Sequence, residues 1–164
     1  MDLTRARRVA AAVLDPELPV LTLADLGVLR DVAADDDGLL VTITPTYSGC
    51  PAMETMRTDL VASLRAAGFD RVRVRTALSP AWTTDWITED GRRKLVEYGI
   101  APPNKVNRRT GPVPLTLSPP VSLVRCPRCG SPDTEELSRF GATACKALRR
   151  CRSCAEPFEH IKEL

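Results

Sequence analysis

Groups for acid–base and nucleophilic catalysis are scarce in this 164-residue sequence. It contains a single histidine, His160, so the first hundred residues offer no cysteine–histidine pair for nucleophilic catalysis. It has no P-loop and no GxGxxG phosphate-binding fingerprint. Nor do paired carboxylates stand at a recognisable acid–base spacing. We therefore expect a protein that is not an enzyme in its own right.

Long hydrophobic runs are also missing, and aromatic residues make up only 4% of the chain. No stretch approaches the roughly 20 apolar residues that a membrane-spanning helix needs. Arginines interrupt the N-terminal stretch Met1–Val13, unlike the apolar run of a signal peptide. We therefore expect a cytoplasmic protein with no membrane partner. In a reducing compartment, its six cysteines are more typical of metal ligands or reactive thiols than of disulfides.

The composition divides the chain into three parts. Residues 1–100 carry a net charge of −3, from 12 Lys and Arg against 15 Asp and Glu, whereas residues 101–164 carry +5, from 11 against 6. We predict a domain over residues 1–100 and a four-cysteine module over residues 124–164. Residues 101–123 are predicted to be a semi-rigid linker, because they include the prolines Pro102, Pro103, Pro112, Pro114, Pro119 and Pro120.

The first hundred residues predict a small α+β domain. Apolar spacing and alternation favour helices over residues 3–14, 52–66 and 84–98, and strands over residues 26–32, 39–44 and 71–77. Asp15-Pro16 is expected to end the first helix, and Asp35–Gly38 to form a hairpin turn. The order helix, strand, strand, helix, strand, helix places the helices on one face of a short mixed sheet.

Two Cys-x2-Cys pairs near the C-terminus predict a metal site. Cys126 and Cys129 form one pair, and Cys151 and Cys154 form the other. Each pair can place two thiolates on one ion, so the two pairs together complete a tetrahedral four-sulfur site of the zinc-ribbon type. The segment between them has few large apolar residues, so metal binding is expected to supply much of its folding free energy. The spacing does not separate zinc from iron.

Other residues of the module have more than one interpretation. Cys145 could be a substitute ligand, a reactive thiol beside Lys146, or a small buried hydrophobic residue. His160 is expected on the surface, since a closed four-cysteine site has no vacancy for it. The basic run 149–152 could contact nucleic acid, but a solvated or protein-facing patch is favoured because no aromatic residues interleave with the charges.

Cys50 is the lone cysteine of the first domain. It is predicted at the N-cap of the helix that begins with Pro51, where backbone N–H groups and the helix dipole favour a thiolate. An accessible thiol of this kind can bind a soft metal or accept sulfur, although a small residue packed under the sheet is the alternative. The carboxylates Asp15, Glu17 and Asp25 lack a metal-binding spacing and suit loop capping better.

Several stretches resemble known families. Asp15–Pro19, Leu26–Val32 and Thr42–Thr44 leading to Cys50-Pro51 are similar to the SufT-like domain of iron–sulfur cluster assembly factors. With the two cysteine pairs, three further stretches resemble the D component of the bacterial phenylacetyl-CoA epoxidase system, over residues 7–164. These stretches are Ser79–Trp86, Tyr98–Pro103 and Phe140–Leu148. Ala142 departs mildly from a serine expected in many relatives.

The resemblance implies an accessory or maturation subunit that assists iron–sulfur cluster assembly in a partner component. The partners implied are the diiron oxygenase or the reductase component, and iron–sulfur assembly machinery; a homo-oligomer is a further possibility. Cys50 corresponds to the family cysteine, so transient iron or an iron–sulfur cluster is implied there, with Asp15 and Glu17 in the supporting loop. A purely structural subunit and, less favoured, a nucleic-acid-binding zinc ribbon remain alternatives.

Overall fold

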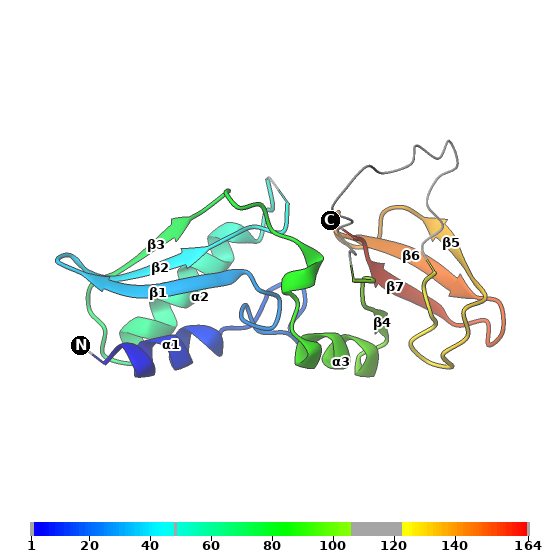
Figure 1. The fold of residues 1–164 in the computed structure, drawn as a ribbon, viewed down its shortest axis with the longest axis horizontal. Helices are drawn as coiled ribbons and strands as arrows, with labels where there is room; N and C mark the ends of the chain where they lie inside the picture. The colour runs from blue at the N-terminus through cyan, green and yellow to red at the C-terminus, as the bar shows by residue number, and fades with distance from the viewer. Residues whose placement is uncertain (1, 48, 106–122, 164) are drawn as a thin grey trace, which may run out of the picture. The chain divides into compact units, whose positions relative to one another are not determined.

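The computed structural model describes residues 2–47, 49–105 and 123–163. Within these ranges the chain forms two units, the first ending at Tyr98 and the second running from Gly99 to Glu163 (Figure 1). Most of the predicted linker, residues 106–122, lies outside the described residues. None of the helices in the described ranges is long and apolar enough to cross a membrane.

The first unit has a three-stranded mixed sheet at its centre. Strand β2 pairs antiparallel with β1 and parallel with β3, so the order is β1-β2-β3. The predicted order of elements and the α+β class are confirmed. The elements are α1 (Leu3–Ala11), β1 (Leu29–Asp35), β2 (Gly38–Ile43), α2 (Met53–Ala66), β3 (Val72–Thr76), the short 3-10 helix η1 (Thr84–Trp86) and α3 (Glu89–Glu97).

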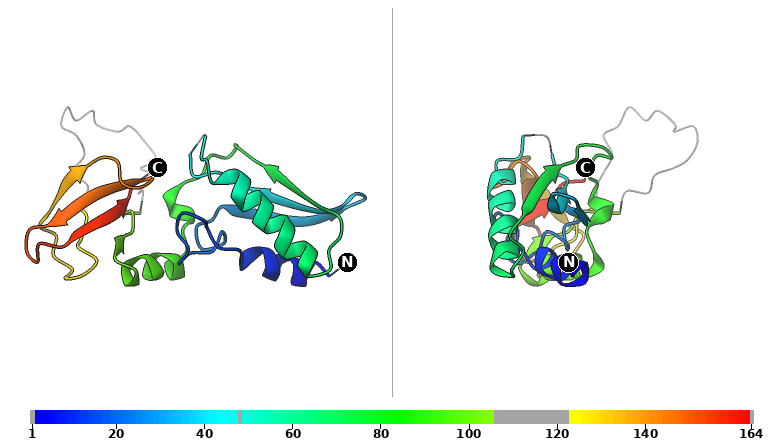
Figure 2. Two further views of the ribbon diagram at one scale, coloured as in Figure 1. Left: turned by 180° about the vertical axis from the view of Figure 1, so that it is seen from behind. Right: turned by 90° about the vertical axis from the view of Figure 1, so that its left-hand side faces the viewer.

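The core of this unit lies between the sheet and α2. Leu39, Val41 and Ile43 alternate along β2, and their side chains are completely buried. Helix α2 contributes Leu60 and Leu64, one turn apart, and lies across one face of the sheet (Figure 2, left). Every second residue of β2 and two residues four positions apart on α2 thus form this core. Each such side chain contributes about 1.5–3 kcal/mol of transfer free energy.

At two of the predicted helices, hydrogen bonds that the apolar spacing does not reveal move a boundary. Helix α1 ends at Ala11 rather than Leu14, because the backbone that follows turns to pair with residues 21–23; for example, the N–H of Leu23 donates to the carbonyl of Val13 at 2.8 Å. The predicted helix 84–98 is divided, because Thr88 is an N-cap whose hydroxyl accepts from the N–H of Gly91 and starts α3 there.

Gly27, which precedes β1, lets the chain pack closely against the segment that contains Trp82 and Trp86. Its φ is +70°, and a Cβ atom there would lie 2.6 Å from Cβ and the carbonyl oxygen of Trp86. The indole N–H of Trp82 donates to the carbonyl of Leu26 at 2.9 Å, and the guanidinium of Arg30 lies 3.5 Å from the ring centroid of Trp86. The two stretches, far apart in sequence, therefore form one packed contact that only glycine permits.

The second unit is a four-stranded sheet of order β4-β7-β6-β5. Its strands are β4 (Ile100–Ala101), β5 (Thr134–Ser138), β6 (Lys146–Cys151) and β7 (Pro157–Ile161). The β5, β6 and β7 strands are antiparallel neighbours, whereas β4 runs parallel to β7. Because β7 lies between β4 and β6, its residues Glu159 and His160 have a paired strand on each side.

Because of strand β4, the boundary between the two units lies earlier in the chain than the sequence predicts. Ile100 pairs with Glu159 and Ala101 with His160, and both β4 residues are buried. The sequence placed Ile100 at the end of the first domain and Ala101 in the linker, but their pairing puts them in the second unit. The passage between the units is therefore at Tyr98–Gly99, and residues 106–122 connect two segments of the same unit.

This connectivity predicts that cutting the chain within residues 106–122 does not separate the two units. A protease recognition sequence inserted between residues 113 and 114 lets the chain be cleaved after folding. The two fragments should elute together in size-exclusion chromatography, because β4 stays paired with β7. Fragments that separate under native conditions, with bound metal retained, would contradict the assignment of β4.

Candidate functional site

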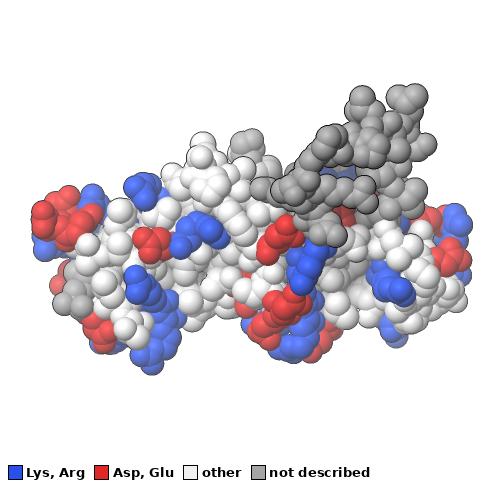
Figure 3. All heavy atoms as spheres, in the orientation of Figure 1, with Lys and Arg blue, Asp and Glu red and all other residues white. Residues whose placement is uncertain are grey.

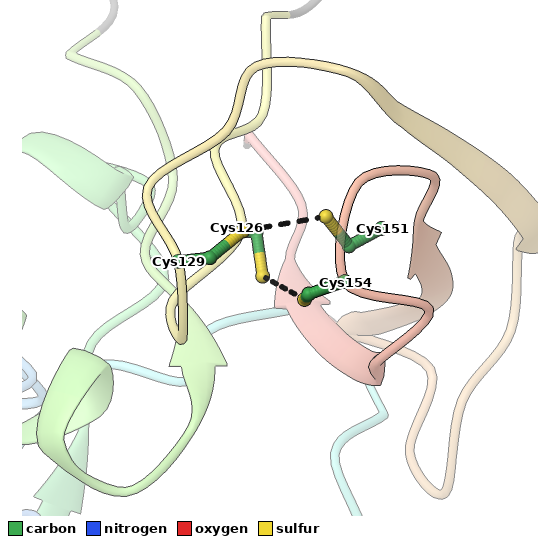
Figure 4. Close-up of side chains that lie close together, drawn as sticks. All are labelled: Cys126, Cys129, Cys151 and Cys154. Atoms are coloured by element: carbon green, nitrogen blue, oxygen red, sulfur yellow. Dashed lines mark hydrogen bonds between the residues drawn. The ribbon is translucent and has the colours of Figure 1, made fainter.

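The four paired cysteines converge on one point in the second unit. Cys126 Sγ lies 3.8 Å from Cys154 Sγ, and Cys129 Sγ lies 3.5 Å from Cys151 Sγ (Figure 4). All four sulfurs lie within 4.8 Å of one another. Ligands about 2.3 Å from a tetrahedral zinc ion are about 3.8 Å apart, so the spacing fits a single ion. The described residues contain no other cluster of three or more Cys, His, Asp or Glu that could hold a metal.

Each cysteine pair lies on a turn of the same design. The N–H of Cys126 donates to the carbonyl of Ser131 at 3.0 Å, and the N–H of Cys151 donates to the carbonyl of Glu156 at 2.9 Å. In both turns the residue after the second cysteine has a positive φ. The first turn has Gly130 there, at 74°, whereas the second has Ala155, at 61°. Two equivalent turns therefore face each other, and one of them carries backbone strain that glycine would avoid.

Backbone N–H groups within the turns are aimed at the sulfurs. The N–H of Cys154 lowers the pKa of the Cys151 thiol to about 6, against desolvation. The N–H of Ser131 also lowers the pKa of Cys129, but hydrogen bonding with Cys151 and desolvation outweigh it and raise that pKa to about 12. Hydrogen bonding and burial therefore move the pKa values of these two thiols in opposite directions. A bound cation displaces the remaining protons, so metal affinity falls as the pH falls.

Two of the four candidate metal ligands are also part of the hydrophobic core of this unit. Cys126 and Cys151 are almost completely buried and cluster with Ala101, Val124 and Phe158. Sequence reasoning missed Ala101, because it stands in a proline-rich stretch that reads as a linker. The apolar pair Ile100-Ala101 immediately before Pro102-Pro103 was the available signal.

Acidic side chains neutralise the basic run beside the second turn. Glu135 accepts hydrogen bonds from Arg150 Nε at 2.9 Å and from Arg152 Nη2 at 2.8 Å. Arg149 pairs with Glu136 at 3.7 Å. Within the described residues, basic and acidic groups are interspersed on the face drawn in Figure 3. This arrangement argues against a phosphate-binding surface on residues 149–152.

The other two candidates of the module lie outside the four-cysteine group. His160 is 3% exposed on β7, so the expectation of a surface residue is wrong; burial between β4 and β6 lowers the pKa of its imidazole. Cys145 is half-buried, and its sulfur lies 3.1 Å from the hydroxyl oxygen of Thr143. A role for Cys145 as a substitute ligand gains no support from this placement.

Cys50 lies just before α2 but is not its N-cap. The N-cap is Ala52, whose carbonyl accepts from the N–H of Met56; Cys50 opens the turn that precedes it, accepting from the N–H of Met53 at 3.3 Å. The residue is 8% exposed, so its thiol is buried rather than accessible. Pro51 and Ala52 add this extra turn, which moves the start of the helix beyond the predicted position.

The carboxylates of the first unit stabilise loops. Asp15 is buried and accepts the N–H groups of Glu17 and Leu18 at 2.8 and 2.7 Å. Asp25 accepts from the N–H of Thr22 and from Lys94 Nζ at 2.8 Å. These hydrogen bonds and the Lys94 charge outweigh desolvation and lower the pKa of Asp25. The capping interpretation of Asp15 and Asp25 agrees with these contacts.

Known proteins share this combination of an α+β unit and a four-cysteine ribbon. A family model described as "Iron-sulfur cluster assembly protein" matches residues 6–76, and one described as "PaaD zinc beta ribbon domain" matches residues 111–162. An Escherichia coli (strain K12) protein, named as the D component of a "Putative 1,2-phenylacetyl-CoA epoxidase", is 49% identical over 148 residues, covering 90% of this chain and 85% of that protein. The chain belongs to the family of phenylacetyl-CoA epoxidase D components.

Two further relatives each match a little more than half of this family member. A Porphyromonas gingivalis protein named "Fe-S protein maturation auxiliary factor" is 31% identical over 90 residues, 54% of this chain and 85% of that protein. A crystal structure of a domain of unknown function, DUF59, from Bacillus anthracis is 25% identical, with a TM-score of 0.52 over 57% of this chain and 90% of that one. The resemblances to an iron–sulfur assembly domain and to the epoxidase D component are thus confirmed.

The positive φ angles of the two cysteine turns predict opposite changes in zinc affinity for two substitutions. Ala155→Gly should strengthen zinc binding about fivefold, because removing a left-handed non-glycine residue gains about 1 kcal/mol. Gly130→Ala should weaken zinc binding by a similar factor. Competition with a chromogenic chelator measures both affinities.

Gly130 is a clean site for this comparison, because a Cβ atom there meets nothing within 4 Å and only the backbone conformation changes. Equal affinities for the wild type and both variants would show that the turns do not hold the metal in the described geometry.

Proposed function

We propose that this protein is an accessory maturation subunit of phenylacetyl-CoA epoxidase that assists iron–sulfur cluster assembly or maintenance in a partner component. The observation that carries the proposal is the 148-residue alignment to the epoxidase D component, which is too long to fit in either unit alone. The relative named as an iron–sulfur maturation factor supports the same role for the first unit. We also propose that the protein is located in the cytoplasm.

We assign zinc to the four-cysteine site as a structural ion. Four thiolates with tetrahedral spacing fill every position of a zinc ion, so no site is left for a substrate or a water molecule. The two buried cysteines lie in the core of their unit, which ties metal binding to folding. The ribbon would therefore stabilise the second unit and present its outer surface to a partner.

Cys50 is the candidate for handling iron or sulfur. It lies with Asp15 and Glu17 inside the segment matched by the iron–sulfur assembly family. Because its thiol is buried, transfer to or from a client requires a local opening that exposes Cys50. Asp15 and Glu17 have a supporting role here, since Asp15 holds the loop 15–18 through backbone N–H groups.

A purely structural subunit is the second candidate function. The observation that favours it is the burial of Cys50, since a scaffold needs no accessible thiol. In either case the partner is the reductase or the diiron oxygenase component. The two functions differ in whether the cluster content of the reductase depends on Cys50.

Metal and sulfide analysis of anaerobically purified protein tests the assignment of two separate sites. Cys151→Ser should lose the zinc, about one ion per chain for a four-cysteine site. Cys50→Ser should retain the zinc and lose any bound iron or sulfide. In cells, the reductase component should carry less iron–sulfur cluster when the accessory protein has the Cys50→Ser change.

Cys145→Ser is the matched control, because Cys145 is a cysteine outside the four-cysteine group. It should keep both the zinc content and the cluster content of the client. Normal cluster occupancy with Cys50→Ser would contradict the maturation mechanism and leave the scaffold function.

A further inference from the structure

The connection between β5 and β6 exposes an unusual amount of apolar surface. We name residues 137–146 the Phe140 loop. Phe140 is 68% exposed, and the neighbouring Leu137 is 50% exposed. Leu137 lies where the pairing of β5 with β6 shifts between Glu136 and Ser138. Bulges of this kind on edge strands redirect side chains, and the Leu137 side chain is half exposed here.

The Phe140 loop is held in one conformation by its own polar groups. The hydroxyl of Ser138 donates to the carbonyl of Phe140 at 2.9 Å and accepts from its N–H at 3.2 Å. The N–H of Gly141 donates to the carbonyl of Lys146 at 2.7 Å. Beneath the loop, Lys146 Nζ pairs with Glu159 at 2.8 Å, and the Lys146 side chain is only 6% exposed. The exposed ring is therefore presented by an ordered scaffold, which lowers the entropy cost of binding.

One cation lies against the ring. Lys162 Nζ lies 4.8 Å from the ring centroid of Phe140 and donates to the carbonyl of Arg139 at 3.1 Å. Neither Arg139 nor Lys162 pairs with a carboxylate among the residues that the structure describes. The nearby acid Glu159 is already neutralised by Lys146. The Phe140 ring thus has the Lys162 ammonium against it, and a second basic residue, Arg139, precedes it in the sequence.

We infer that the Phe140 loop is a docking surface for a different protein, one that presents an apolar pocket with an acidic rim. Aromatic residues and arginine are enriched in protein–protein interfaces, and Arg139 and Phe140 are adjacent in this loop. Charge complementarity sets the character of the partner's rim. The inference rests on the proposed function for the partner's identity, which is a component of phenylacetyl-CoA epoxidase.

A second copy of the chain does not fit this surface. A two-fold contact through the Phe140 loop would bring Arg139 and Lys162 of one copy against the same residues of the other. Like charges placed across an interface cost affinity. The unpaired cations therefore favour a partner with the opposite charge.

Binding of the purified chain to the purified diiron oxygenase and reductase components tests the inference. Phe140→Ala should raise the Kd for one component by about 30-fold or more, the effect of a hot-spot residue. Leu78→Ala is the matched control, because Leu78 is also 68% exposed but lies in the first unit. Its Kd should stay within about twofold of the wild type. Charge reversal at Arg139 should slow association, most strongly at low salt.

The possible outcomes distinguish a failure of this inference from a failure of the proposed function. If the wild type and Phe140→Ala bind the same component equally, the loop is not the docking surface, and the accessory function stands. If the wild type binds neither component, both the function and the loop's partner are wrong. A homodimer that Phe140→Ala dissociates in analytical ultracentrifugation would replace the acidic partner with a second copy. Unchanged zinc content and melting temperature establish that each variant is folded.

Discussion

The convergence of four cysteine sulfurs is the constraint on which the second unit depends. The unit has few large apolar side chains in its core, and two of the five residues in its buried cluster are ligand candidates, Cys126 and Cys151. Removing the metal would therefore disrupt part of the core as well as the two turns at the surface. This explains how a small sheet with a long connection between its first two strands can hold a defined shape.

The same constraint explains the position of the first segment of the second unit. Strand β4 is only two residues long, yet Ala101 packs against the cysteines and Phe158. The strand immediately follows Tyr98 and Gly99, so formation of the metal site fixes the chain directly after α3. On the opposite edge of the sheet, the ordered β5–β6 connection presents Phe140 to solvent.

Local signals made much of this predictable from the sequence. The cysteine spacing identified the four candidate ligands, and alternation and helical spacing gave the order of elements in the first unit. The errors arose where distant contacts decide the outcome. Two residues are too few to show a strand period, so β4 was missed. The burial of His160 depends on strands on both sides of it. Cys50 is buried and opens an extra turn before α2, and the Cys50-Pro51 pair reveals neither feature.

X-ray absorption at the zinc edge of the purified full-length protein tests the central claim most directly. We expect a single shell of four sulfur atoms at about 2.3 Å and no nitrogen or oxygen ligand. A shell that contains nitrogen or oxygen, or a protein whose four cysteines form disulfides without zinc, would contradict it.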